Sequence, residues 1–300
     1  MKRTTGALLL ILLIQCVIVS TAYWPRPAGL NSTAQPIWRS VDAGSVDEVR
    51  ITDDSKRELV LQQSATGWLV PGLQTLPADP EMISGLLTGL LSQREDWPVA
   101  HSAAARQRFE VADYLFQRRI ELYSGGGKLG TVYLGTSPGF RKVHARAGDQ
   151  DEIYTIDFNA FDAPAKSGDW IDPKLLQIRT PMRIDTDIYS VHREGGAWRS
   201  GNGATPDERE LLALLAALRS LQVKGIADEK QAQLLDEVEA DLVLHIDSLS
   251  GEVTLQLYRN EGAHFIRSSE YPLFFILGRY DYDQLTSIDI ERISGLHSAE

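Results

Sequence analysis

The sequence predicts an α+β protein made of two tandem repeated modules, each an antiparallel β-sheet packed by one main helix, after an N-terminal transmembrane helix. Three observations predict this architecture. An uncharged apolar run opens the chain, a leucine-rich helical pattern occurs twice, and segments of alternating hydrophobicity follow both copies. The expected divisions are an anchor or signal peptide (1–24), a linker (25–44), a first module (45–180), a second module (181–293) and a tail (294–300).

The uncharged run extends from Ala7 to Trp24 and follows Lys2 and Arg3. At about 1.5 Å per residue it measures about 27 Å, which is enough to cross the hydrocarbon core of a membrane. Basic residues before the run favour a cytoplasmic N-terminus and an exported remainder. We therefore expect a single-pass inner-membrane protein, anchored through residues 7–24, whose soluble part lies in the periplasm.

Two alternatives concern the same segment. Small residues at Ser20-Thr21-Ala22 would suit a signal peptidase, so cleavage of the segment stays open. Lipid attachment at Cys16 is disfavoured, because Gln15 before it is not small and the apolar run continues after it. An uncleaved anchor is favoured because the run is longer than the roughly 7–15 apolar residues of a signal peptide.

Charge and cysteine content exclude several classes of site. The net charge of −11 argues against a nucleic-acid partner, which calls for a basic face. Cys16 is the single cysteine and lies inside the apolar run. The soluble part therefore has no disulfide, no thiolate metal site and no cysteine nucleophile.

Two segments carry the repeated helical pattern, LPADPEMISGLLTGLL (76–91) and ATPDERELLALLAALRSL (204–221). Asp79 and Asp207 occupy matching positions before leucines at helical spacing, and acidic residues fill the first turn of each segment. An aspartate cap, first-turn acids and a leucine stripe are typical of an amphipathic helix that buries one face.

Alternating segments on both sides of each helix predict the sheets. Trp68 and Trp198 precede the two helices at similar intervals, and Gly127 and Gly251 fall in matching turns. The expected strands of the first module lie at 47–52, 57–63, 118–135, 140–148 and 152–158, and those of the second at 187–194, 241–258, 263–270 and 271–277. We expect 171–178 to close the first module and 287–293 to form a closing strand of the second.

One short motif suggests catalysis, the G-x-S-x-G pattern of Gly135, Ser137 and Gly139. A nucleophile elbow needs a helix after the serine and the backbone N–H of the next residue for its oxyanion hole. Here a strand-like segment follows, and the next residue is Pro138, which has no N–H. We therefore interpret the motif as a hairpin turn, and SGGGK (124–128) likewise as a turn and not a phosphate loop.

No other group of residues predicts a site, and we expect no catalytic, cofactor-binding or metal-binding residue. The acidic clusters at 148–152, 185–187 and 280–283 do not complete a calcium loop, and Asp149 and Asp151 are expected in a hairpin turn. The histidines lack paired ligand spacing and are expected at surface or strand positions: His101, His144, His192, His245, His264 and His297. Core positions are expected for Trp68, Trp170, Trp198, Tyr271, Phe274 and Phe275, with a carbohydrate or peptide groove as the alternative.

The order of the segments DEVRIT, GWLV, LPADPEMISGLLTGL and WIDPKLLQI resembles a bacterial family, the domain of unknown function 4340. The resemblance is strongest over 45–180 and looser in the second copy, which has no clear WIDPKLL equivalent. It implies an N-terminally anchored extracytoplasmic protein associated with ABC transporters of the gliding-motility type. It implies no catalytic residue.

The expected function is that of a membrane-anchored periplasmic scaffold or accessory protein without enzymatic activity, working with an ABC-type transport or envelope complex. Its expected partners are proteins, including the ATPase and permease subunits of such a transporter. Two alternatives stay open: an extracytoplasmic binding module that holds glycan, peptide or lipid in a groove between the modules, and an unrecognised hydrolase.

Overall fold

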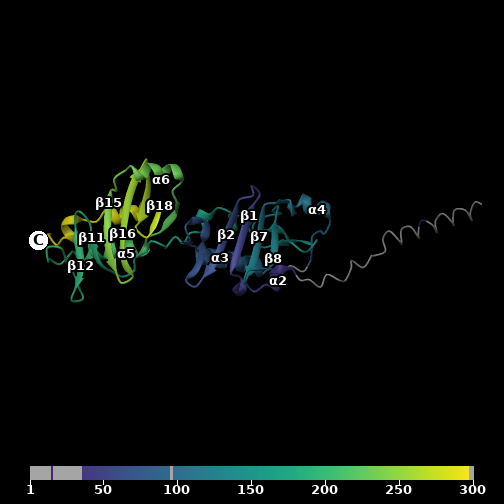
Figure 1. Cartoon of the computed structure of the whole chain (residues 1–300), viewed down its shortest axis with the longest axis horizontal. Helices are drawn as coiled ribbons and strands as arrows, with labels where there is room; N and C mark the ends of the chain where they lie inside the picture. The colour runs from purple at the N-terminus through teal and green to yellow at the C-terminus, as the bar shows by residue number, and fades with distance from the viewer. Residues whose placement is uncertain (1–14, 16–35, 95–96, 297–300) are drawn as a thin grey trace, which may run out of the picture.

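The protein is an α+β structure with two large antiparallel sheets, as expected from the sequence (Figure 1). The computed structural model describes Gln15, residues 36–94 and residues 97–296. The expected transmembrane segment, 7–24, thus falls outside the described residues apart from Gln15. Within the described part of the chain, no helix has the length and apolarity needed to cross a bilayer.

The first sheet has eight strands in the order β10-β9-β8-β7-β1-β2-β3-β4. Their bounds are β1 Glu48–Asp53, β2 Glu58–Ser64, β3 Gly67–Val70, β4 Leu76–Pro77, β7 Arg118–Ser124, β8 Gly127–Leu134, β9 Val143–Ala147 and β10 Ile153–Ile156. The short helices and strands around it are α2 Ile37–Ser40, α4 Ala103–Arg108, β5 Val111–Ala112 and β6 Leu115–Phe116. Helix α3, Pro80–Leu91, crosses one face and buries Ile83, Leu86, Leu87 and Leu90 against the strands.

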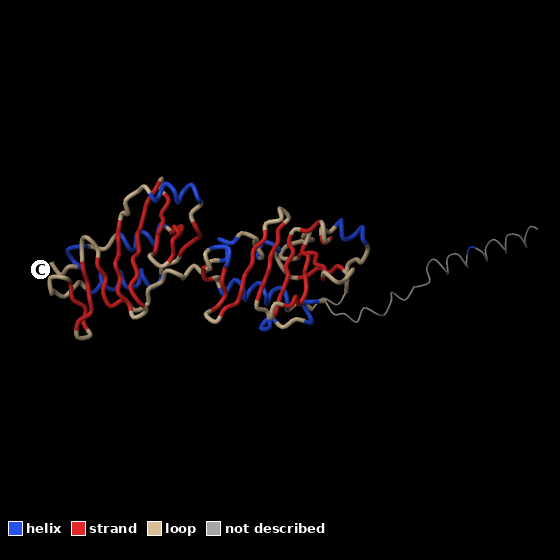
Figure 2. The backbone as a smooth tube through the Cα atoms, viewed as in Figure 1, coloured by secondary structure: helices blue, strands red, loops and turns tan. Residues whose placement is uncertain are grey.

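The second sheet also has eight strands, in the order β13-β12-β11-β15-β16-β17-β18-β14. Their bounds are β11 Pro181–Asp185, β12 Ser190–Glu194, β13 Ala197–Ser200, β14 Val223–Ile226, β15 Leu242–Ser248, β16 Gly251–Asn260, β17 Ala263–Ser268 and β18 Tyr271–Leu277. The helices are α5 Glu208–Ser220, α6 Glu229–Asp236, α7 Arg279–Thr286 and α8 Ile290–Ile293. Leucines of α5 pack on this sheet, and the tube in Figure 2 shows a helix lying along a face of each sheet.

The aspartates before the two main helices are N-caps, as the sequence predicts. The Asp79 carboxylate accepts hydrogen bonds from the backbone of Glu81 and Met82, and the Asp207 carboxylate accepts from Arg209 and Glu210. Each cap satisfies two N–H groups that have no partner inside the helix. The start of each helix is therefore fixed locally, before any packing on a sheet.

The predicted turn at SGGGK (124–128) is confirmed, whereas Gly127 and Gly251, expected within turns, are the first residues of β8 and β16. Gly125 and Gly126 join β7 to β8 with φ of 57° and 77°, a backbone that favours glycine. Residues 148–152, with Asp149 and Asp151, join β9 to β10.

Three expectations differ from the structure. Residues 287–293 do not form a strand: Asp289 caps α8 there, accepting a hydrogen bond from the backbone of Arg292. The second sheet opens with β11, one strand before the expected start at 187–194. Residues 36–44 do not behave as a linker, since α2 buries Ile37 and Trp38 in the core of the first sheet.

The segment expected to close the first module instead joins the two sheets. Ile171, Leu176 and Ile178 pack in the core of the second sheet, together with Leu76 of β4. The expectation that this segment closes the first module is therefore wrong, because its apolar side chains belong to the core of the second sheet.

Backbone hydrogen bonds tie the same segment to both sheets. Trp170 C=O accepts from Asp79 N–H at 2.8 Å, and Pro77 C=O accepts from Asp172 N–H at 2.9 Å. On the other side, Pro173 C=O accepts from Val223 N–H of β14 at 2.9 Å. Residues 170–178, which we call the joining segment, therefore lie between the edge strands β4 and β14, and the two sheets follow one another along the molecule (Figure 1).

Candidate functional site

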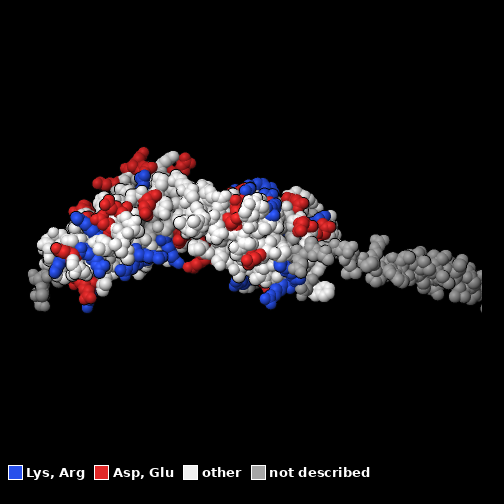
Figure 3. All heavy atoms as spheres, turned by 60° about the horizontal axis from the view of Figure 1, so that its bottom comes forward, with Lys and Arg blue, Asp and Glu red and all other residues white. Residues whose placement is uncertain are grey.

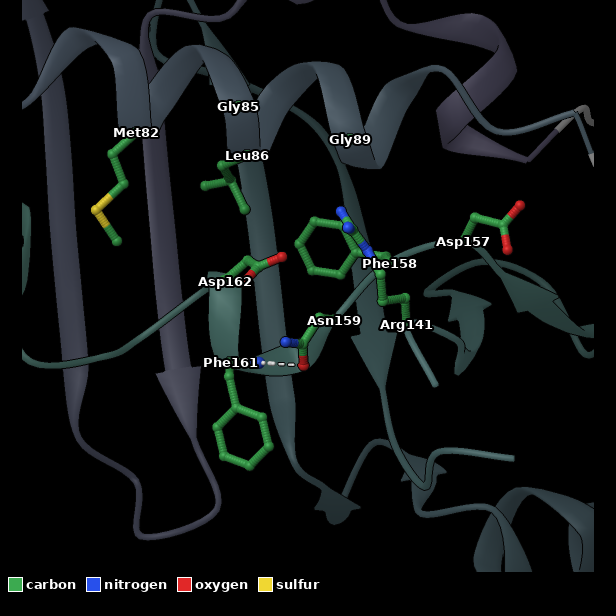
Figure 4. Close-up of a pocket in the computed structure, with 10 residues that line it drawn as sticks. All are labelled: Met82, Gly85, Leu86, Gly89, Arg141, Asp157, Phe158, Asn159, Phe161 and Asp162. Carbon is green, nitrogen blue, oxygen red and sulfur yellow. Dashed lines mark hydrogen bonds between the residues drawn. The ribbon is translucent and has the colours of Figure 1, made fainter. Parts of the chain in front are cut away.

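A pocket of about 700 Å³ lies beside α3 in the first half. Met82, Gly85, Leu86 and Gly89 line it from the helix, and the chain that follows β10 lines it from the other side. In Figure 4, the Leu86 side chain descends from α3 between Met82 and Phe158, and Asp162 lies below it. We call this cavity the α3 pocket.

The second wall is formed by residues 157–162. Phe158 is 5% exposed, and its ring lies 3.3 Å from where a Cβ on Gly89 would be, so glycine lets the ring contact the helix. The backbone then makes one short turn, in which Asn159 Oδ1 accepts a hydrogen bond from Phe161 N–H at 3.1 Å (Figure 4). The Phe161 side chain is 81% exposed at the rim of the pocket.

Gln93 holds the two walls together. Its Nε2 donates to the backbone carbonyls of Gly89 at 2.5 Å and Asp157 at 3.0 Å, and its Oε1 accepts from Asp157 N–H at 3.0 Å. The side chain is buried, so these bonds are shielded from water. The spacing between α3 and residues 157–162 is therefore set by one buried amide.

The charges at the rim are mixed. Arg141 comes from the turn between β8 and β9, and Asp157 and Asp162 come from the second wall. Lys142 Nζ lies 3.4 Å from Asp157 Oδ1 in an exposed ion pair. The lining thus combines apolar surface with both signs of charge, and its ten residues include no hydroxyl, thiol or imidazole group. Such a surface suits binding of apolar side chains.

The G-x-S-x-G motif is a turn between β8 and β9. Ser137 Oγ donates to the backbone carbonyls of Gly139 at 2.7 Å and Lys142 at 2.6 Å, and no helix follows the serine. Gly135 has a packing role, because a Cβ there would lie 1.9 Å from the Phe109 carbonyl oxygen. The turn contributes to the α3 pocket only through Arg141.

His144 is the one predicted histidine that is buried among the described residues. Its Nδ1 lies 2.8 Å from the Thr136 carbonyl oxygen, and its ring lies 4.1 Å from that of Phe109. Burial lowers the pKa of this imidazole, and the positive charge of Arg108 lowers it further, whereas the bond to Thr136 opposes the shift.

The remaining candidates are spread over the molecule. His245 bonds Thr254, His264 contacts the Tyr282 ring, and His297 lies outside the described residues. Asp151, Asp185 and Asp283 form ion pairs with Arg106, Arg183 and Arg279. No three metal-ligating residues come together in the described part of the chain. Trp170, Phe274 and Phe275 are buried in cores, and Trp68, Trp198 and Tyr271 pack against them half-buried.

The α3 pocket could not be predicted from the sequence. Its walls come from residues 82–89, 141 and 157–162, which carry no reactive group and no known spacing. One signal was present: two glycines four residues apart in a helix interior, Gly85 and Gly89, where glycine lowers helix stability.

Fold and pocket together define an α+β protein of two linked antiparallel sheets with an apolar surface pocket. The chain belongs to the family described as Domain of unknown function (DUF4340), whose profile matches residues 68–238. The match begins in β3, crosses the joining segment and ends after α6, so it includes parts of both sheets. Neither the curated proteins nor the solved structures contain a match to the chain.

Proposed function

We propose that the protein is a membrane-anchored periplasmic scaffold or accessory subunit that works by binding other proteins. The observation that carries this proposal is the joining segment, which links two sheets that otherwise each bury their own core. A linked pair of sheets with an apolar pocket holds partners at fixed positions, which is what a scaffold requires.

The proposal includes an internal repeat. From the outer edge of the first sheet, the order β10-β9-β8-β7-β1-β2-β3 corresponds to β18-β17-β16-β15-β11-β12-β13 in the second. The capped helices α3 and α5 follow β4 and β13, at the same stage of each half. This agreement supports a duplication, in which β14 and α6 are additions to the second copy.

The expected partners are proteins, including the ATPase and permease subunits of an ABC-type transporter. Acidic and basic side chains are interspersed on the face shown in Figure 3, and the net charge of −11 argues against nucleic acid. The anchor at residues 7–24 would place the first half nearer the membrane, because α2 packs on β8, on the side of the first sheet away from the second (Figure 1).

The test is purification of the full chain from solubilised membranes after mild chemical cross-linking. We expect recovery of transporter or envelope subunits, and fractionation should keep residues 1–24 with the membrane-bound protein. Recovery of the chain alone, without any membrane partner, would refute the scaffold proposal.

The alternative function is an extracytoplasmic binding module with a groove between the modules. Because the joining segment occupies the space between the sheets, the ligand of such a module would bind in the α3 pocket instead. The hydrolase alternative depends on Ser137, whose hydroxyl is engaged with backbone carbonyls. We expect Ser137→Ala to leave any ester hydrolysis by the purified protein unchanged, measured with a chromogenic ester. A large loss of a measurable rate would restore the hydrolase interpretation.

A further inference from the structure

The two halves differ in what covers their main helix. In the second half, the chain leaves β18 at Gly278 and forms α7, which packs against α5. Tyr282 and Leu285 of α7 are 4% and 1% exposed, and Ile293 of α8 is fully buried in the same core. An amphipathic helix with apolar residues three apart therefore covers α5.

The first half lacks such a helix at this point. The chain leaves β10 and forms two short 3-10 helices, Ala160–Asp162 and Ser167–Trp170, of which the second runs into the joining segment. The α3 pocket lies between the first of these short helices and α3. In the order of elements, the chain after β10 corresponds to the chain after β18, which forms α7 in the second half.

Matching positions on the two helices support this comparison. Counted from the capping aspartate, Met82 in the pocket corresponds to Glu210, which accepts a hydrogen bond from Asp289 N–H just before α8 at 3.1 Å. Gly89 corresponds to Ala217, which is buried in the second half, whereas Gly89 is only half-buried. At these two positions, the helix surface that is covered in the second half faces the pocket in the first.

We propose that the α3 pocket is the docking site for an amphipathic helix of a partner protein, with apolar side chains at i and i+3 like Tyr282 and Leu285 of α7. This inference rests on the proposed scaffold function and names the chemistry of the partner. The backbone of α3 is open to close approach, because a Cβ on Gly85 would meet nothing within 4 Å. Arg141, Asp157 and Asp162 at the rim suit a helix with a polar face of mixed charge.

The occupant belongs to a different polypeptide. Tyr282 and Leu285 of this chain are already buried in the core of the second sheet, so a second copy could offer its own α7 only by unfolding its second half. The predicted anchor at 7–24 is apolar on all sides and lacks the polar face that the rim would contact.

Site-specific photo-cross-linking in intact cells tests this proposal. Met82→p-benzoylphenylalanine in the full chain should give one discrete adduct on irradiation, cross-linked to a partner segment with apolar residues at helical spacing. The same probe at Leu249, exposed in the turn between β15 and β16, should not give that adduct.

A second substitution fills the pocket. Gly85→Trp combined with the probe at Met82 should reduce the adduct at least tenfold, while Gly72→Trp, also at a position open to solvent, should leave it unchanged. Circular dichroism melting should show that both variants fold. The inference is overturned by no adduct above the Leu249 control, by an adduct to a second copy of this chain, by cross-linking to a non-helical segment, or by an adduct that Gly85→Trp does not reduce.

Failure of this inference differs from failure of the scaffold proposal. Membrane partners that still co-purify with Gly85→Trp at the wild-type level would leave the scaffold proposal standing and exclude the pocket as its contact site. Loss of co-purification in Gly85→Trp, but not in Gly72→Trp, supports both.

Discussion

Arg146 stabilises two loops of the first half from a buried position in β9. Its side chain is 3% exposed, and its guanidinium lies 4.6 Å from the Tyr133 ring. Its acceptors are the backbone carbonyls of Val111, Ala147, Gly148 and Gln150 and the carboxylate of Asp113. A planar fork of five donors can reach these acceptors together, and an ammonium group cannot.

We therefore expect Arg146→Lys to lower the free energy of unfolding by about 2–3 kcal/mol, because buried carbonyls lose their donors. Urea denaturation measures this loss. The matched control is Arg183→Lys, at an exposed ion pair with Asp185, where solvent screens the interaction and the loss should be much smaller than for Arg146→Lys. Equal losses in the two variants would show that the buried hydrogen bonds of Arg146 do not contribute more to the free energy of unfolding than an exposed ion pair does.

His144 should make stability depend on pH. Burial lowers its pKa below the ordinary 6.5, so the unfolded chain takes up a proton before the folded chain does. The stabilising contribution is complete above pH about 6.5 and is lost as the pH falls through that value toward the folded pKa. We expect His144→Asn to flatten the unfolding free energy between pH 7.5 and about 5, as measured by urea titrations at each pH. An unchanged slope would assign the pH dependence to other groups.

At the scale of the element, two glycines should respond oppositely to alanine. Gly85 lies in the interior of α3 with open space around it, so Gly85→Ala should raise stability by about 0.5–1 kcal/mol. Gly135 should not tolerate a side chain, because its Cβ would lie 1.9 Å from the Phe109 carbonyl oxygen. Thermal melting of both variants checks this, and a stable Gly135→Ala protein would contradict the packing role of that glycine.

Elements with local signals could be predicted from the sequence. The main helices carry an aspartate cap and a leucine stripe, and the β7–β8 and β15–β16 hairpins carry glycine at the turn, so each is specified by nearby residues. Residues 287–293 were predicted wrongly because Ile288 and Ile290 alternate as in a strand, while Ile290 and Ile293 also fit a helix. The cap at Asp289 decides for the helix.

Elements that depend on distant partners could not be predicted. Strand β11 is a short segment whose alternation is weak, and it pairs with β15, more than fifty residues away along the chain. The α3 pocket is formed by three segments that are separate in sequence, residues 82–89, 141 and 157–162. In the described part of the chain, no counterpart of α7 follows β10 to cover it. The two main helices, the hairpins and most strands could be predicted from the sequence. The position of the pocket could not, because it depends on tertiary packing.

At the scale of the whole molecule, the joining segment should make the two halves unfold and tumble together. Inserting four glycine and serine residues between Asp172 and Pro173 should uncouple the hydrogen bond of Asp172 to Pro77 from that of Val223 to Pro173, and so separate the halves. The ion pair of Lys174 with Glu81, which lowers the pKa of that carboxyl, should be lost too. We expect small-angle scattering to report a more flexible particle and calorimetry to resolve two transitions. A single transition and an unchanged scattering profile would mean that other contacts join the halves.

The two joined sheets set the distance over which the molecule extends. Two eight-stranded sheets placed edge to edge span up to about 75 Å at about 4.8 Å per strand. Under the proposed anchoring through residues 7–24, the second half would lie far from the bilayer. A partner on the α3 pocket would then bind close to the membrane, and a partner on the second half would bind well above it.

The same arrangement bears on how the protein stays dispersed at high concentration. Unpaired strand edges invite sheets of neighbouring molecules to add to one another and polymerise. The joining segment occupies the edges at β4 and β14, and the chain at Ala100 bridges to Ile153 on the edge strand β10. Among the described strands of the two large sheets, the edge strand without such a neighbour is β13, which has only four residues.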